Sequence, residues 1–284
     1  MALRRSSLRL AARQGAGKAR RAPALGLVAV LGAVLLPAGG NAQLEPYTPG
    51  PDKPVSLELV LAVDTSSSVS VEEFDLQMRG FANAFRDPTV IAAIGATGVN
   101  GIAVSMIQWS DNRRQQVAVD WALLSDPVSI EGFAQAIDDT PRFLDGGGTA
   151  IGGAIAFALS QMERNGYVGT RRVVDISGDG RANQGAQPET LRDAAVLQGV
   201  TINGLAILNE DTSVDGYYRN SVIGGPGAFV MTANDYESFA QAIIEKLVKE
   251  IGGVPVVEAP GAPAAAGEGP MTAQVRTLRR ISYD

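Results

Sequence analysis

Short apolar runs alternate with helix-length amphipathic segments along the middle of the chain, and this alternation constrains the fold more than any other feature. The run at residues 56–63 (SLELVLAV) has the length and composition of a buried parallel strand. The segment at residues 71–86 places four apolar side chains at helical spacing. Repetition of this unit predicts βαβ crossovers, and therefore an α/β fold with a doubly wound, mostly parallel central sheet flanked by helices.

The same patterns predict the remaining elements. Further strands are predicted at residues 101–109, 172–177, 200–207 and 228–232, with residues 116–124 forming a hairpin with the run at 101–109. Further helices are predicted at residues 129–137, 150–164, 188–198 and 236–251. Ser129 is predicted as the N-cap of the first of these. Asp175 lies inside an apolar strand, where an unpaired carboxylate is costly, so we expect it to face a buried donor such as an Arg or a backbone amide.

The first 42 residues have the organisation of an export signal. Seven basic residues and no acidic residue precede an apolar run from Ala24 to Leu36, and small residues follow it up to Ala42. This run is shorter than the ~20 residues that a membrane-spanning helix needs. A signal cleaved after Ala42 is therefore favoured over a membrane anchor. The protein is expected in the periplasm or outside the cell, with no stable membrane span after cleavage.

A single folded domain is predicted between two segments of biased composition. Residues 43–54 indicate a Pro-rich linker, residues 55–252 the domain, and residues 253–284 a Pro- and Ala-rich tail without stable structure. Of the 24 Lys and Arg residues, 7 lie in the signal, which leaves 17 against 30 Asp and Glu residues and a net charge of −13. Such a charge opposes binding to nucleic acid and to anionic lipid, and it suits cations.

The composition also excludes several kinds of chemistry. The chain contains no Cys and no His. Disulfides, thiolate or imidazole metal ligands, Cys nucleophiles and Ser-His-Asp triads are therefore excluded. Any metal site in this chain has to be built from oxygen atoms.

Oxygen-bearing side chains gather in three predicted loops. Asp64, Ser66 and Ser68 directly follow the first strand at spacing i, i+2, i+4, so alternate side chains of an extended loop can converge on one point. Thr149 ends a glycine-rich turn before a helix, and Asp179 follows a later strand. Because ligands of open α/β sheets bind beyond the carboxyl ends of the strands, these five side chains are expected to meet. Carboxylates with hydroxyls suit Mg²⁺, Mn²⁺ or Ca²⁺.

Each loop also has an ordinary structural reading. Asp64 could cap the helix that begins near Val71, and the serines could form local hydroxyl turns. The Asp179-Gly180 pair could be a type I turn. The joint occurrence of the three loops at strand ends and at a helix start favours a metal site.

The three loops, in this order, resemble the metal-ion-dependent adhesion site of von Willebrand factor A domains. The resemblance rests on D-x-S-x-S after the first strand, Thr in a Gly-rich turn before a helix, and Asp-Gly after a later strand. The predicted order of strands and helices fits that family over residues 55–252. More narrowly, the segments VVDISGDG and GGGTAIGGAI resemble an uncharacterised group of exported bacterial A-type domains.

The resemblance implies a role for each residue. Ser66 and Ser68 would bind the ion through their hydroxyl oxygens, and Asp64 would hold it directly or through water. Thr149 and Asp179 would alternate between direct and water-mediated contact. The sixth position would be left for an Asp or Glu carboxylate of a partner protein. The cation would be Mg²⁺, with Mn²⁺ or Ca²⁺ as alternatives, and the domain would be a binding module rather than an enzyme.

Two other functions are alternatives to this one. A metal-assisted hydrolase acting on phosphoesters would use Asp64 as nucleophile or ligand and Asp179 as a second ligand, with the glycine-rich turn cradling phosphate. Against it, the three loops contain no Lys to hold a phosphate. A dinucleotide-binding protein ranks last, because no G-x-G-x-x-G follows the first strand.

Overall fold

The structure is a computed structural model that describes residues 52–253. The predicted signal at residues 1–42 lies outside the described residues, as do nearly all of the predicted linker and tail. Among residues 52–253, no helix is both long enough and apolar enough to cross a bilayer.

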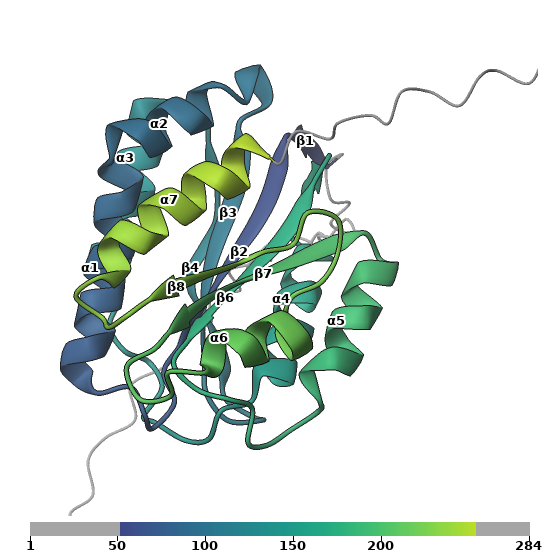
Figure 1. Ribbon diagram of the computed structural model, residues 1–284. Coiled ribbons are helices and arrows are strands. Elements are labelled where there is room, and N and C mark those ends of the chain that lie inside the picture. Colours follow the sequence, from purple (N-terminus) through teal and green to yellow (C-terminus); the bar gives the residue numbers. More distant parts are fainter. Residues whose placement is uncertain (1–51, 254–284) are drawn as a thin grey trace, which may run out of the picture. The chain divides into compact units, whose positions relative to one another are not determined.

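A six-stranded sheet forms the centre of the domain (Figure 1). In sheet order its strands are β4 (Gln115–Leu124), β3 (Ile102–Trp109), β2 (Leu57–Asp64), β6 (Arg172–Gly178), β7 (Val200–Ile207) and β8 (Val230–Ala233). All neighbours are parallel except β4, which runs antiparallel to β3 as the predicted hairpin requires. The predicted fold class, a mostly parallel α/β sheet, is confirmed.

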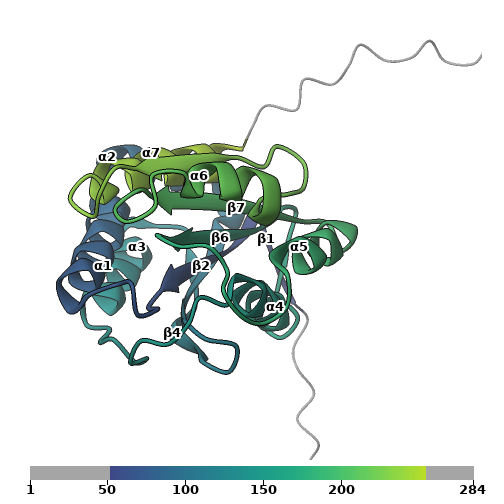
Figure 2. The ribbon, with the colours of Figure 1, turned by 60° about the horizontal axis from the view of Figure 1, so that its bottom comes forward.

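Helices cover both faces of the sheet (Figure 2). One face carries α1 (Val71–Arg86), α2 (Pro88–Gly95), α3 (Pro127–Asp138) and α7 (Phe239–Gly252). The other carries α4 (Ile151–Met162), α5 (Pro188–Leu197), α6 (Val214–Tyr217) and the π-helical turn η2 (Tyr218–Val222). The observed ends of the predicted helices lie within three residues of the predicted ends.

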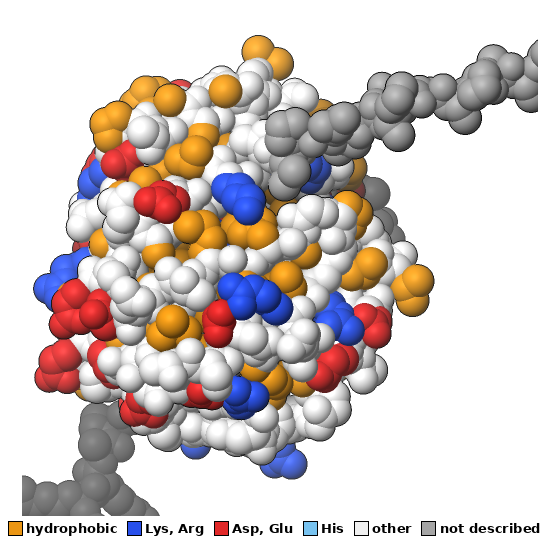
Figure 3. Space-filling view, in the orientation of Figure 1, with side chains coloured by type: hydrophobic (Ala, Val, Ile, Leu, Met, Phe, Trp, Pro, Cys, Tyr) orange, Lys and Arg blue, Asp and Glu red, His pale blue; other side chains and the backbone are white. Residues whose placement is uncertain are grey.

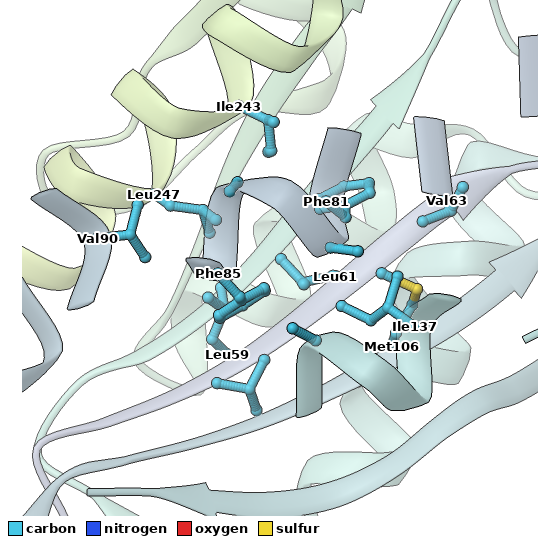
Figure 4. Close-up of a cluster of buried hydrophobic side chains, with 14 of the residues drawn as sticks. Leu59, Leu61, Val63, Phe81, Phe85, Val90, Met106, Ile137, Ile243 and Leu247 are labelled. Atoms are coloured by element: carbon cyan, nitrogen blue, oxygen red, sulfur yellow. The ribbon is translucent and has the colours of Figure 1, made fainter. Parts of the chain in front are cut away.

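The central strand β2 contributes side chains to the apolar core on both faces of the sheet, because successive side chains of a strand point to opposite faces. Leu59 and Leu61 pack against the layer of α1 and α7 (Figure 4). Val60 belongs to the cluster on the opposite face, which contains residues of α4. Phe81 of α1 meets Phe239 of α7 edge to face, with ring centroids 5.2 Å apart. Every residue of β2 is buried, so this strand presents Asp64 at its end on a rigid support.

The start of α3 differs from the prediction. The helix begins at Pro127 with Asp126 as its N-cap, and the prediction of Ser129 as the cap is wrong. Asp126 accepts from the backbone N–H groups of Val128 and Ser129, both at 2.9 Å. Pro at the first helical position needs no hydrogen-bond partner for its nitrogen, so the helix extends two residues beyond the apolar pattern.

Replacement of Asp126 by Ala is expected to lower the free energy of unfolding by about 1 kcal/mol, because two N–H groups lose their acceptor. Asp139→Ala, at the other end of α3, removes an acid from the end where the helix dipole disfavours it, and should leave stability unchanged or slightly higher. Urea unfolding of both variants measures the two values. Equal losses would contradict the role of Asp126 as the cap.

Several short elements follow no strong local pattern and have no counterpart in the sequence-based predictions, among them α2, β1 (Lys53–Val55) and β5 (Tyr167–Gly169). The helix α2 starts at Pro88, directly after Asp87, which ends α1 and caps α2. A separate two-stranded parallel sheet pairs β1 with β5. β1 thus begins inside the segment predicted as linker. A strand of three residues is too short to show an alternation of apolar and polar side chains. Its stability comes from hydrogen-bonded pairing with a distant strand, which the local sequence does not indicate.

The buried carboxylate of Asp175 has a partner of a different kind from those predicted. Lys246 of α7 places its Nζ 2.6 Å from Asp175 Oδ1 and 2.5 Å from Glu250 Oε1, and all three side chains are fully buried. Asn203 of β7 donates to the same Glu250 oxygen at 2.8 Å. The donor is therefore a Lys, not an Arg or a backbone amide, and it ties α7 to the middle of the sheet.

Candidate metal centre

The predicted site residues lie at the carboxyl ends of two neighbouring strands. Asp64 is the last residue of β2, and Asp179 directly follows β6, its neighbour in the sheet. From β2 the chain moves first to β3 on one side and later to β6 on the other. This change of direction is where open α/β sheets leave a crevice for ligands.

Asp64 has one satisfied and one unsatisfied carboxylate oxygen. Its Oδ1 accepts from the backbone N–H of Ser66 at 2.7 Å. Its Oδ2 is buried and has no hydrogen-bond partner among the described residues. Burial, and then the charge of Asp179, raise the pKa of Asp64 to about 8. A buried oxygen of this kind normally has a partner, so the site is built to receive one.

A chain of hydrogen bonds joins the loop after β2 to the loop after β6. The hydroxyl oxygens of Ser66 and Ser68 lie 3.0 Å apart, and Ser68 donates to Asp179 Oδ1 at 2.8 Å. The Tyr236 hydroxyl donates to Asp179 Oδ2 at 3.1 Å. Burial raises the pKa of Asp179, although these two hydroxyl donors counteract the rise. Both loops therefore face one point.

Thr149 lies beside the Asp179 turn. Its N–H donates to Asn183 Oδ1 at 2.9 Å, and the Asn183 N–H donates back to the Thr149 carbonyl at 3.0 Å. The Thr149 hydroxyl is within 3.7 Å of the position that a Cβ on Gly180 would take. The structure thus brings all five predicted side chains to the same end of the sheet.

The glycine-rich turn is fastened to the loop after β2. Ser67 N–H donates to the Gly147 carbonyl at 3.0 Å, and Gly147 N–H donates to Ser67 Oγ at 2.8 Å. Gly146 and Gly147 have φ angles of 58° and 116°, a region that side chains disfavour. Ser67 therefore holds the two loops together, while its neighbours Ser66 and Ser68 point into the site.

Three residues that the sequence did not single out complete the site. Arg142 donates to the carbonyls of Thr65 and Val69, both at 2.9 Å, and these hydrogen bonds hold the backbone of the loop after β2 in place. Tyr236 anchors Asp179. Tyr218 has a buried hydroxyl without a partner, and the charge of Asp64 is one cause that raises its pKa, after burial. No local motif marks these three residues, because each reaches the site from a distant segment.

Glycine at position 178 is required by the site. A Cβ there would lie 2.7 Å from Asp64 Oδ2 and 2.9 Å from the Tyr218 hydroxyl. Asp64 Oδ2 and the Tyr218 hydroxyl, the two buried groups without partners, therefore border the same small space above Gly178.

The donor set fits a hard divalent cation. Its side-chain oxygens come from two carboxylates and three hydroxyls, the ligands that Mg²⁺, Mn²⁺ and Ca²⁺ accept. Within residues 52–253, no group of three or more acidic residues is placed to hold a metal. The cation would therefore be held by a hydroxyl-rich set of low negative charge, and Asp64 Oδ2 would gain the partner that it lacks.

Gly178→Ala is expected to weaken Mg²⁺ binding by about tenfold or more, because the new methyl group displaces the Asp64 carboxylate by contact at 2.7 Å. Gly180→Ala, two residues away, is the matched control, since its methyl group would meet only Thr149 at an ordinary 3.7 Å. Calorimetric titration with Mg²⁺ measures both affinities. The placement of Asp64 is wrong if the two variants bind equally well.

A family model described as "Protein of unknown function (DUF1194)" matches residues 54–255. The chain belongs to this family. The match spans nearly all of the described domain, including the five site residues. The comparison with curated proteins gives no match.

Solved structures share the fold at low sequence identity. Proximal thread matrix protein 1 from the mussel byssus gives a TM-score of 0.54 at 17% identity, over 71% of this chain and 48% of that chain. A structure of the same protein with a zinc-occupied MIDAS motif gives 0.51 at 17% identity, over 72% and 50%. The pilus adhesin SpaC from Lactobacillus rhamnosus GG gives 0.50 at 14% identity, over 71% and 31%.

This chain spans about half the length of the mussel protein and less of the adhesin. At these identities the likeness is one of fold. The domain has the von Willebrand factor A-type fold, and at the level of fold the resemblance inferred from the sequence is confirmed.

Proposed function

We propose that this domain is a divalent-cation-dependent protein-binding module rather than an enzyme. The cation is held by Asp64, Ser66, Ser68, Thr149 and Asp179, and Mg²⁺ is the first choice. A partner protein supplies an Asp or Glu carboxylate that completes the oxygen shell. The observation that carries the proposal is the buried Oδ2 of Asp64, which has no hydrogen-bond partner among the described residues, in the same loop as the linked hydroxyls of Ser66 and Ser68.

The charge of the donor set favours capture of an external acid. Hydroxyl oxygens are neutral, so they leave much of the charge of a divalent cation uncompensated. Each carboxylate oxygen of Asp179 already accepts a hydrogen bond, one from Ser68 and one from Tyr236. These hydrogen bonds reduce the electron density that Asp179 can donate to the ion. If Asp179 acts through water, Asp64 supplies the single negative charge among the direct ligands. A carboxylate from outside then brings the direct oxygen shell to neutrality and fills an octahedral arrangement.

The hydrolase alternative gains no support from the glycine-rich turn. A phosphate cradle needs free backbone N–H groups. Here Gly147 N–H is bound to Ser67 Oγ, and Thr149 N–H is bound to Asn183 Oδ1. Both donors are already used within the protein.

Retention of envelope proteins on the immobilised full chain tests the proposal. Partners are expected to bind in Mg²⁺, to be released by EDTA, and to be lost with Ser66→Ala. Ser160→Ala is the control, because its hydroxyl donates to the Phe157 carbonyl within α4 and takes no part in the Ser66–Ser68–Asp179 chain. Association that persists unchanged in EDTA would overturn the proposal. The choice of envelope proteins follows from the predicted export signal, which lies outside the described residues.

A further inference from the structure

A second candidate site lies at the opposite edge of the sheet from the metal centre. A cavity of about 310 Å³ is lined by the first residues of β6 and β7 and by the end of α7. Because β6 and β7 run parallel, their beginnings lie at the edge away from Asp179, roughly 20 Å along the strand. The volume is at the lower end of the ~300–1,000 Å³ range of small-molecule sites.

Three cationic side chains line this cavity, although the domain as a whole is acidic. Residues 52–253 carry 26 Asp and Glu residues against 14 Lys and Arg residues. Arg171, Arg172 and Lys249 nevertheless meet here, and none of them forms an ion pair with a carboxylate of the described domain. The acid in the lining, Glu250, is already paired with Lys246 at 2.5 Å. The cavity is therefore a positively charged place in a negatively charged protein.

Two of the three cationic side chains, Arg172 and Lys249, keep N–H donors free for a ligand. Arg171 uses both terminal nitrogens on the carbonyls of Glu250 and Ile251 at 2.7 Å, which fixes it as a wall of the cavity. Arg172 uses Nη2 on the Gln198 carbonyl and retains its other N–H groups. The Lys249 ammonium contacts the ring of Phe229, 3.9 Å from its centroid. Arg172 and Lys249 can thus both turn N–H donors toward an anion.

The rest of the lining combines apolar side chains with the polar side chains of Thr170, Thr201 and Asn203. Val173, Pro226 and Phe229 contribute to the wall, and the Phe229 ring lies directly beside the Lys249 ammonium. In the space-filling view of the face that carries α7 and β8, Lys and Arg side chains border apolar surface (Figure 3). A ligand that suits both parts carries an anionic group on an apolar body.

We propose that this cavity binds a small organic anion, either a carboxylate or a phosphate ester, whose charge meets Arg172 and Lys249 and whose apolar body packs on Phe229. The site is independent of the metal centre. Charge-assisted hydrogen bonds to Arg and Lys supply the recognition of the anion, and burial of the apolar body supplies further affinity.

Calorimetric titration of the full chain in EDTA tests the proposal, since the chelator removes any contribution of the metal centre. Phenyl phosphate, phenylacetate and uncharged benzyl alcohol are the probes. At least one of the two anions is expected to bind with a Kd of about 1 mM or tighter, and benzyl alcohol more weakly. Binding of only one anion identifies the charged group as phosphate or as carboxylate.

The variant Arg172→Gln/Lys249→Gln is expected to weaken anion binding by about tenfold or more. Arg164→Gln is the matched control, because Arg164 is an exposed arginine outside the cavity lining, and it should bind as the unmodified chain does. The proposal is overturned if neither anion binds, if benzyl alcohol binds as tightly as the anions, or if the double variant keeps the original affinity.

Discussion

Asp64→Asn is expected to reduce Mg²⁺ and Mn²⁺ affinity by about 100-fold or more, since even the loss of a group behind a metal ligand costs 10–100-fold. The same substitution should not destabilise the metal-free protein. The amide keeps an oxygen for the Ser66 N–H and carries no charge to bury. Loss of metal binding without loss of stability is a combination that general misfolding cannot produce.

The pH dependence of stability follows from the pKa of Asp64, which rises from its usual 3.8 to about 8 in the folded, metal-free chain. The folded state therefore holds this proton more tightly than the unfolded state does. The contribution is fully favourable below pH 4 and is lost as the pH rises from 4 to 8. In EDTA at pH 8, Asp64→Asn should consequently be more stable than the unmodified chain.

Asp145→Asn is the control for Asp64→Asn, because Asp145 is an exposed acid in the neighbouring glycine-rich turn. Titration with Mg²⁺ measures the metal affinity of both variants, and thermal unfolding in EDTA measures their stability without metal. Equal metal affinity in Asp64→Asn and Asp145→Asn would remove Asp64 from the site.

Lys246→Met is expected to lower the free energy of unfolding by about 3–5 kcal/mol at pH 8, the loss typical of breaking a buried ion pair. The substitution leaves Asp175 and Glu250 without their shared cation in a fully buried place. The Lys246–Asp175 contact at 2.6 Å lacks hydrogen-bond geometry, so its contribution is electrostatic. The loss therefore comes mainly from uncompensated charge, together with the hydrogen bond that Lys246 donates to Glu250 Oε1.

The loss in Lys246→Met should shrink as the pH falls. Burial, and then the charge of Glu250, raise the pKa of Asp175 to about 7. Below that pH the carboxyl takes up a proton in the folded state, and the repulsion that the variant creates disappears. Urea unfolding at pH 8 and at pH 5 measures the difference. Lys249→Met, on the exposed side of the same helix, is expected to lose less than about 0.5 kcal/mol.

A loss in Lys246→Met that is the same at both pH values would contradict this account of the buried cluster. It would show that the apolar part of the Lys side chain, and not its charge, stabilises the contact between α7 and the sheet.

The sequence predicted those features that depend on local chemistry. The first helix was predicted at its observed bounds because its apolar side chains recur at helical spacing, and in the structure a capping box of Ser70 and Glu73 marks its start. The site loops were predicted because each follows an apolar strand or precedes a helix. Parallel pairing then brings the strand ends to one edge of the sheet.

Features that depend on contacts between distant segments were not predictable in this way. Arg142 lies 77 positions from Thr65, whose carbonyl it binds, and Tyr236 lies 57 positions from Asp179. Lys246 was missed as the partner of Asp175 for the same reason, since only tertiary packing brings α7 over the middle of β6. A single residue of common type carries no local signal of such a contact.

Diffraction from crystals soaked in Mn²⁺, recorded for the anomalous signal of that ion, tests the central claim most directly. One strong anomalous peak is expected at the carboxyl ends of β2 and β6, within coordinating reach of Ser66 and Ser68 and beside Asp64, Thr149 and Asp179. A map without a peak at that position, while Mn²⁺ is bound elsewhere or not at all, would contradict the claim.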